Sequence, residues 1–309
     1  MRILVSGISG FIAPRVANLL INHKVLGIER YVTGRTLYQR DESFNRCFCD
    51  LNDFHGIKQI IKMFQPEIML HLGALSPVSL SYNQPIITNQ TNYMATINLA
   101  ESCMQLVPNF KQFIFAGTSE EYGNQKIIPI KEDVLLKPNS PYAVSKVASN
   151  IYLEYMRDAY NFPITIVRPF NTYGRVGTTH FVTERIITQM LNKKKILRLG
   201  DPLPIRDMMY VDDHVDAYLS VLNNKKAIGE TFNFCTGKGY TISEMVELIS
   251  KNIGWRGKVL WNTIPKRPLD IDVLIGDNNK AKNLLNWKPQ YSFSEGLDII
   301  VRELRNKYG

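Results

Sequence analysis

The feature that most constrains the fold is a glycine-containing turn close to the start of the chain. Residues 2–6 form a short apolar run typical of a strand, and Gly7, Gly10 and Ala13 follow it at three-residue spacing before a helix-like pattern that reaches residue 21. The first glycine permits a sharp turn, the second lets backbone approach a pyrophosphate, and a small third residue lets helix pack on strand. The pattern therefore predicts a dinucleotide-binding unit of a parallel α/β sheet.

A second unit places polar side chains at the end of a predicted central strand. Residues 113–116 are apolar, and Thr118, Ser119 and Glu120 come directly after them. In an open parallel sheet, side chains that follow the strand ends meet at the ligand-binding edge. A hydroxyl and a carboxylate at that edge suit proton transfer to and from a substrate alcohol.

A tyrosine and a lysine one helical turn apart follow this unit. Ser140 is a suitable helix cap, and Pro141 fits the first helical position, where no N–H is needed. Tyr142 and Lys146 then share one helical face. Such a pair is commonly an ordinary helix surface, but the polar groups at the neighbouring strand end favour chemistry. Because an ammonium stabilises a phenolate, we expect Tyr142 to act as an acid and base near neutral pH, although the pKa of an isolated tyrosine is about 10.

Size and composition are those of a globular enzyme. The chain has 309 residues, 45% of them hydrophobic and 21% charged, which is enough for one large or two closely packed domains. No apolar run approaches the roughly 20 residues that span a bilayer, and the first residues lack the long apolar segment of a signal peptide. We therefore expect a cytoplasmic protein that does not insert into a membrane.

Cysteine spacing and net charge bear on two further classes of protein: those with metal sites or disulfides, and those that bind nucleic acid. Cys47, Cys49, Cys103 and Cys235 contain no C-x-x-C pair and have no accompanying histidine cluster, so we expect neither a metal site nor a disulfide framework. The net charge is +9 and the pI is about 9.2, but the densest basic run is only residues 193–195. We therefore expect no nucleic-acid partner, and the positive balance suits an anionic nucleotide-diphosphate substrate.

Together these features resemble the extended short-chain dehydrogenase/reductase superfamily, specifically its members that modify nucleotide sugars. Further similar segments extend the resemblance over essentially the whole chain: H-L-G-A at 71–74, R-P-F-N-T-Y-G at 168–174, R-D-M-M-Y-V-D-D at 206–213, R-P-L-D at 267–270 and L-N-W-K-P at 285–289. The resemblance implies an α/β fold, a Rossmann-type doubly wound parallel sheet with a smaller C-terminal substrate domain.

The resemblance also implies a division of the chain into two parts. Residues 1–168, with about 206–235, would bind NAD or NADP. Residues 169–205 and 236–309 would bind the nucleotide sugar.

The implied cofactor site combines the glycine turn, the ends of the next strands and the Tyr-Lys pair. Its residues in this chain are Gly7, Ser9, Gly10, Phe11, Ile12, Glu29, Arg30, Asp50, Leu51, Leu72, Gly73, Ala74, Ser76, Tyr142 and Lys146. Glu29 could accept hydrogen bonds from the adenosine ribose and favours NAD, whereas Arg30 and Arg35 could bind a 2′-phosphate, so NADP stays open. Asp50 has an alternative role as the cap of a helix predicted at residues 53–64.

Three side chains are implied to bind the substrate. Asn171 would reach its phosphates, Arg206 would lie near the nucleotide base or ribose, and Arg267 would bind the diphosphate with two parallel hydrogen bonds. Arg175 departs from the proline that is usual in its segment.

The resemblance also implies roles for two of the predicted helices, in bracing the active site and in forming a dimer. Asn92 matches the helix asparagine that braces the active site in this family. The family usually forms homodimers through the helices predicted here at residues 84–107 and 141–160, which makes a homodimer the expected state.

The residues after the strand end indicate which family member this is. Thr118-Ser119-Glu120 resembles the Thr-Ser-Glu of GDP-mannose 4,6-dehydratases, whereas dTDP-glucose dehydratases have Thr-Asp-Glu and UDP-sugar epimerases usually have small residues. The implied activity is an NAD(P)-dependent nucleotide-sugar 4,6-dehydratase. Thr118, Ser119, Glu120, Tyr142 and Lys146 would be its catalytic residues.

Other activities remain open. A 4-keto-6-deoxy-sugar reductase is one, because such enzymes have a Ser-Ser-Glu-Glu-Tyr-Gly segment close to residues 118–123. A nucleotide-sugar 4-epimerase is another, and a non-catalytic nucleotide-binding protein is the least favoured.

Overall fold

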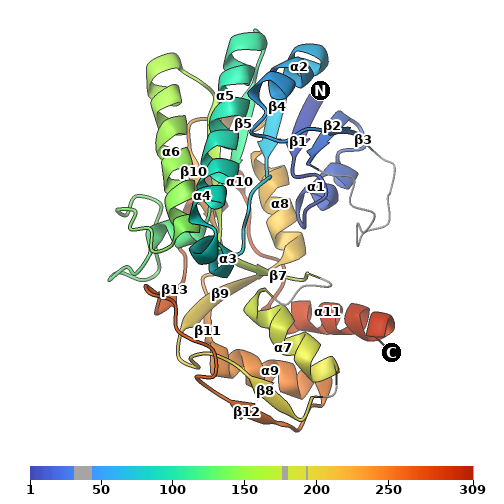
Figure 1. The fold of residues 1–309 in the computed structure, drawn as a ribbon, viewed down its shortest axis with the longest axis vertical. Coiled ribbons are helices and arrows are strands. Elements are labelled where there is room, and N and C mark those ends of the chain that lie inside the picture. The colour runs from blue at the N-terminus through green and yellow to red at the C-terminus, as the bar shows by residue number, and fades with distance from the viewer. Residues whose placement is uncertain (31–43, 176–179, 193, 309) are drawn as a thin grey trace.

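Seven parallel strands form the central sheet in the part of the chain that the structure describes (Figure 1). The computed structural model describes residues 1–30, 44–175, 180–192 and 194–308. In sheet order the strands are β10 Thr231–Phe234, β6 Ile164–Pro169, β5 Gln112–Ala116, β4 Ile68–His71, β1 Arg2–Ser6, β2 Lys24–Glu29 and β3 Asn45–Phe48. The order reverses between β1 and β4, and ligands of such sheets bind at the carboxyl ends of the strands at this reversal.

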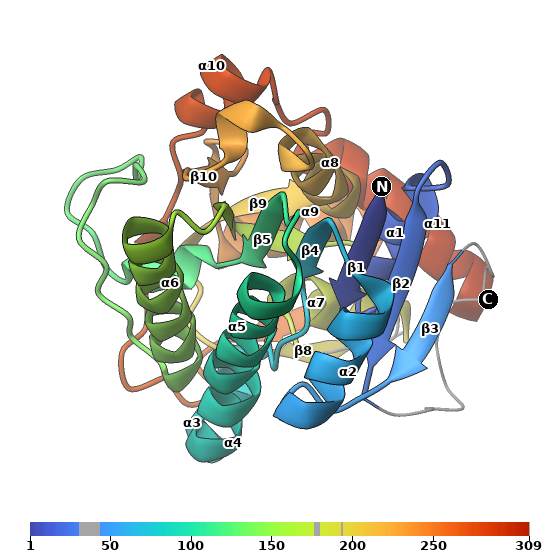
Figure 2. The same ribbon diagram turned by 90° about the horizontal axis from the view of Figure 1, so that it is seen from above.

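Helices cover both faces of this sheet (Figure 2). On one face lie α2 Phe54–Phe64, α5 Ala95–Leu106 and α6 Pro141–Tyr160, and on the other lie α1 Ala13–Leu19, α8 Val211–Val221 and α10 Asn279–Leu285. Strand β1 shows why both faces need cover, because Ile3 and Val5 enter one core while Leu4 enters the opposite one. The predicted doubly wound α/β sheet is therefore confirmed.

The helix predicted at residues 84–107 is an almost continuous rod with a wider turn inside it. It comprises α4 Pro85–Asn89, the π-helical turn η1 Gln90–Met94 and α5, and the short α3 Val78–Asn83 precedes it. The π turn contains Asn92, whose Nδ2 donates to Ser145 Oγ at 2.9 Å and whose Oδ1 accepts from Leu75 N at 2.8 Å. Asn92 thus ties α6 to the segment after β4, which is the bracing role that the resemblance implies.

The helix predicted to begin at Pro141 is confirmed as α6. Ser140 Oγ accepts a hydrogen bond from Ala143 N at 3.1 Å, and Asn161 ends the helix in a left-handed conformation with φ of 54°. No helix in the described ranges, α6 included, is long and apolar enough to cross a membrane.

A second group of elements lies below the carboxyl ends of the sheet in Figure 1. It consists of a small sheet, a strand pair and three helices: β7 Asn171–Tyr173, β9 Ile205–Tyr210, β11 Gly239–Thr241 and β13 Val273–Leu274; β8 Ile196–Arg198 and β12 Lys258–Leu260; α7 Val182–Leu191, α9 Ile242–Ile253 and α11 Phe293–Tyr308. The 3-10 turns are η2 Ser119–Tyr122 and η3 Lys225–Ala227. These elements have a core of their own, to which Ile187, Met245 and Ile300 belong.

Strand β9 connects the two groups. The sequence places residues 206–235 with the cofactor-binding part, yet β9 pairs with β7, β11 and β13 of the small sheet. Its side chains alternate, so that Met209 packs into the core of the large sheet while Met208 and Tyr210 pack into the second core. The proposed division into two domains therefore has one strand that serves both.

Candidate active site

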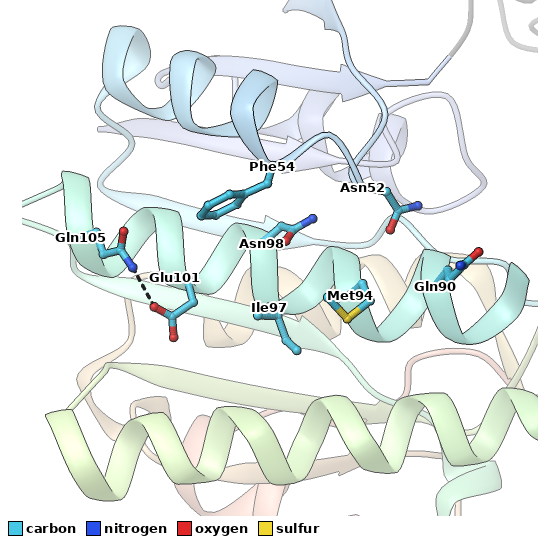
Figure 3. Close-up of a pocket in the computed structure, with 8 residues that line it drawn as sticks. All are labelled: Asn52, Phe54, Gln90, Met94, Ile97, Asn98, Glu101 and Gln105. Atoms are coloured by element: carbon cyan, nitrogen blue, oxygen red, sulfur yellow. Dashed lines mark hydrogen bonds between the residues drawn. The ribbon is translucent and has the colours of Figure 1, made fainter. Parts of the chain in front are cut away.

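A cavity of about 520 Å³ lies at the carboxyl ends of the central strands, between the large sheet and the second group of elements. Fifteen of the residues predicted from the sequence line it: Gly7, Gly10, Phe11, Ile12, Leu72, Ala74, Ser76, Thr118, Ser119, Glu120, Tyr142, Lys146, Asn171, Arg206 and Arg267. The fold thus brings residues from both ends of the chain to one place. A second hollow of about 570 Å³ runs along α5 and is lined by none of the predicted cofactor, catalytic or substrate residues (Figure 3).

The glycine turn packs tightly against the chain that follows β4. Gly7 has a φ of +71°, and a Cβ added there would lie 2.6 Å from Gly73 Cα. A Cβ at Gly10 would lie 2.9 Å from Gly7 O, and one at Gly73 would lie 2.9 Å from Leu51 Cδ1. The turn and the end of β4 therefore pack backbone against backbone at the cavity wall, which fits the close approach of a cofactor pyrophosphate.

The remaining predicted cofactor residues lie outside the cavity lining. Ser9 and Arg30 are exposed, and Glu29 is buried at the end of β2. Glu29 Oε2 is 3.3 Å from Arg46 NH1, a partner that sequence analysis missed because it lies on the neighbouring strand β3. Arg35, the other candidate for a 2′-phosphate, lies outside the described residues.

The alternative role of Asp50 as a helix cap is wrong. Asp53 caps α2, because its Oδ1 accepts from Gly56 N at 2.9 Å. Asp50 instead accepts from Asn52 N at 2.9 Å in the loop beyond β3. Its place in the cofactor site, which the resemblance implies, stays a prediction.

A buried ion pair supports the segment that follows β5. The Thr118 side chain caps η2, and Glu121 Oε1 accepts from Thr118 N at 2.9 Å in return. Glu121 Oε2 is 2.8 Å from Arg168 Nε, and both side chains are at most 3% exposed. Glu121 was not among the residues predicted from the sequence, although the Thr-x-x-Glu spacing of a capping box could have identified it.

Tyr142 and Lys146 both face the cavity, but the pKa of Tyr142 differs from our expectation. Burial raises the pKa of Tyr142, while its hydrogen bond with Thr118 and the charge of Arg175 oppose that rise. Burial lowers the pKa of Lys146 to about 8. Lys146 Nζ donates to Ala116 O at 2.7 Å and lies 4.8 Å from the centre of the Phe115 ring. The expectation that the phenolate is favoured is wrong for the protein alone, because burial is the largest influence on the pKa of Tyr142 and raises it.

Glu120 is a buried carboxyl group turned toward the cavity. It is 7% exposed, and its Oε2 has no hydrogen-bond partner among the residues that the structure describes. Burial raises the pKa of Glu120, and the guanidinium groups of Arg206 and Arg267 oppose this rise. Such a group suits both uptake and release of a proton.

The opposite wall of the cavity is cationic. Arg206 NH2 is 3.3 Å from Asp270 Oδ1, a partner that the R-P-L-D segment contains but whose role the sequence did not reveal. Asn139 Nδ2 donates to Leu269 O at 2.7 Å and so holds the segment that carries Arg267. Asn171 Oδ1 is buried without a partner among the described residues. This wall could bind an anionic, hydrogen-bonding ligand.

Comparison with known proteins gives consistent matches over the full length. The family model described as GDP-mannose 4,6 dehydratase matches residues 4–300. GDP-mannose 4,6 dehydratase of Homo sapiens is 30% identical over 97% of this chain and 89% of its own. A crystal structure of UDP-glucose 4-epimerase from Thermotoga maritima with UDP-glucose has a TM-score of 0.93 and 29% identity over 100% of both chains. UDP-glucose 4-epimerase of Thermus thermophilus, in complex with NAD, has a TM-score of 0.87 and 26% identity over 99% of both chains.

Proposed function

We propose a specific activity for this chain, which belongs to the extended short-chain dehydrogenase/reductase family of nucleotide-sugar epimerases and dehydratases. It is a nucleotide-sugar 4,6-dehydratase that acts on a GDP-mannose-type substrate. The observation that carries this proposal is Glu120, a buried carboxyl group in the cavity whose pKa is raised. Epimerisation at C4 needs a base for one hydroxyl proton. Elimination of water across C5 and C6 needs a further acid and base, which Glu120 supplies.

The side chains divide the work as follows. When bound, a nicotinamide would supply the hydride chemistry at C4 and C6 of the sugar. Tyr142 takes the proton of the C4 hydroxyl, and Thr118, which lowers the pKa of Tyr142, orients that hydroxyl. Glu120 then takes the C5 proton, made acidic by the C4 ketone, and gives it to the C6 hydroxyl, which leaves as water. C5 regains a proton as C6 is reduced, which balances the proton that Tyr142 took from the C4 hydroxyl. Ser119 positions the departing water, and Lys146 holds the cofactor ribose.

The side chains that would bind the cofactor and the substrate are assigned by their charge and hydrogen-bonding capacity. The family is NAD(P)-dependent, and Glu29 at the end of β2 favours NAD in this chain. Arg267 and Asn171 would bind the sugar-nucleotide diphosphate, and Arg206 would lie at the nucleoside. GDP is favoured by the Thr-Ser-Glu segment and by the matching family model.

Mass spectrometry tests the activity directly. We expect one of GDP-mannose, dTDP-glucose, UDP-GlcNAc and CDP-glucose to lose the mass of water on incubation with the purified protein, without added cofactor. GDP-mannose is the expected substrate. Absence of water loss from all four would contradict the proposal.

A 4-epimerase is the second candidate, because several of the similar solved structures are 4-epimerases. Chromatography of the same samples would reveal an isomer of unchanged mass. A 4-ketoreductase would instead consume NADPH with a 4-keto sugar, and nucleotide binding without any turnover would indicate the non-catalytic alternative.

We also propose that the protein is a homodimer that pairs through α5 and α6, which lie on the same face of the sheet (Figure 2). Val144, Ile151 and Tyr155 are exposed by 45%, 59% and 49%, and their spacing puts them on one side of α6. A contiguous apolar helix face of this kind indicates a protein contact.

An Ile151→Glu variant is therefore expected to shift the protein from dimer to monomer, because a charge would be buried in the contact. Light scattering measures the mass. Leu203→Glu, at a residue that is 72% exposed and lies in the loop before β9, serves as control. A wild-type monomer would refute the dimer.

A further inference from the structure

Two arginines and two phenylalanines alternate in a stack, and three of the four side chains line the cavity. Arg15 Cζ lies 4.9 Å from the centre of the Phe11 ring, and Arg175 Cζ lies 4.2 Å from the same ring. Arg175 Cζ also lies 3.9 Å from the centre of the Phe181 ring. Each guanidinium is thus within range of a cation–π interaction, and Arg175 takes part in two of them. We call Arg15, Phe11, Arg175 and Phe181 the stack.

The stack crosses from the glycine turn to the second group of elements. Phe11 follows Gly10 directly in the turn, whereas Phe181 directly precedes α7. Phe11 also packs against the core of the second group. Phe11, Arg175 and Phe181 all line the cavity. The stack therefore joins the turn that would hold the cofactor to the part of the chain that would hold the sugar.

Arg175 is held in place from several sides. Its NH1 donates to Thr172 O, and its backbone N–H donates to Glu184 Oε1 at 3.0 Å. Its side chain is 17% exposed. A planar guanidinium can lie flat on two rings at once, which neither a proline nor an ammonium can do equally well. The departure from proline at this position thus has a structural consequence.

We propose that Arg175 is a positioning residue that locks the glycine turn against the substrate-binding elements and so slows release of the bound dinucleotide. The proposal rests on the proposed function in one respect: a reaction that removes a hydride and returns it needs no exchange of cofactor between turnovers. A reductase, in contrast, must release its oxidised cofactor after each turnover. Slow release therefore suits a dehydratase or an epimerase.

Release of NADH tests the proposal without any sugar substrate. The protein is loaded with NADH, or with NADPH if this binds more tightly, and the fluorescence of the bound cofactor is followed after addition of excess NAD or NADP. Arg175→Gln is expected to speed release about tenfold, because it removes both ring contacts. Phe181→Leu, which removes one contact, is expected to have a smaller effect in the same direction.

Further variants distinguish loss of the stack from other causes of faster cofactor release. Arg175→Lys keeps the charge beside Glu184 but not the flat group, so its release rate should lie between those of wild type and Arg175→Gln. The double variant Arg175→Gln with Phe181→Leu should release no faster than Arg175→Gln, because the two residues act through one contact. Lys238→Gln is the matched control, since Lys238 lies 5.2 Å from the Tyr240 ring outside the cavity lining.

Two outcomes would overturn the proposal. One is an unchanged release rate in both Arg175→Gln and Phe181→Leu. The other is a lower unfolding temperature of the cofactor-free variants with unchanged release, which would mean that the stack only supports the fold. Neither measurement depends on turnover, so the role of Arg175 can be tested even if the protein dehydrates no sugar.

Discussion

A Glu120→Gln variant is expected to lose dehydration by about a thousandfold while it retains oxidation at C4. Glutamine keeps the shape and the hydrogen-bonding oxygen of the side chain but cannot take the C5 proton. Thr118 and Tyr142, which act on the C4 hydroxyl, are unchanged. Because elimination is blocked after the first step, the cofactor should remain reduced.

Two measurements check this expectation. Mass spectrometry follows the loss of water, and absorbance of reduced nicotinamide follows C4 oxidation in a single turnover. Glu132→Gln is the matched control, because burial also raises the pKa of Glu132 but its side chain lies outside the cavity lining and accepts from Asn233 N at 2.8 Å. Full dehydration by Glu120→Gln would remove Glu120 from the mechanism.

Replacement of Arg168 by leucine is expected to lower the free energy of unfolding by about 3–5 kcal/mol. Arg168 bonds Glu121 at 2.8 Å, and its NH1 also donates to Tyr122 Oη at 3.1 Å. Without the guanidinium, the fully buried carboxylate of Glu121 loses the ion pair that it makes among the described residues. The segment that carries Thr118 and Glu120 would lose its support, so activity should fall as well.

The loss of stability should depend on pH. Burial raises the pKa of Glu121, and Arg168 is the largest of the charges that oppose this rise, so its loss moves the folded-state pKa further above the unfolded value of about 4.3. Between these two pKa values the folded protein binds a proton that the unfolded chain has released, so stability falls as pH rises. Urea unfolding at pH 5 and pH 8 should therefore show the larger loss at pH 8.

Lys111→Met provides the comparison for Arg168→Leu. Lys111 Nζ is 2.7 Å from Glu67 Oε1, but this pair lies at the surface, so its loss should cost less than about 1 kcal/mol. Equal and small losses for both variants, or a loss for Arg168→Leu that is the same at both pH values, would show that Glu121 does not need its partner.

The sequence alone determined the features that depend on residues close to one another along the chain. The glycine turn, the cap at Ser140 and the Tyr142–Lys146 spacing are local patterns, and each specifies backbone geometry within a few residues. The strand ends follow from apolar runs, and a parallel sheet brings such ends to one edge. For this reason the amino-acid sequence suffices to predict the fold class and fifteen of the residues that line the cavity.

Only the tertiary structure decided which groups are paired and how their charges behave. Glu121 meets Arg168, Arg206 meets Asp270, and Phe11 meets Arg175 across long stretches of chain, and no local pattern specifies these partners. The pKa of Tyr142 is likewise raised by burial, which depends on all the elements packed around it. Burial and long-range pairing arise from the folded chain as a whole, and for that reason sequence patterns predicted residues that meet at one cavity but not the electrostatics of that cavity.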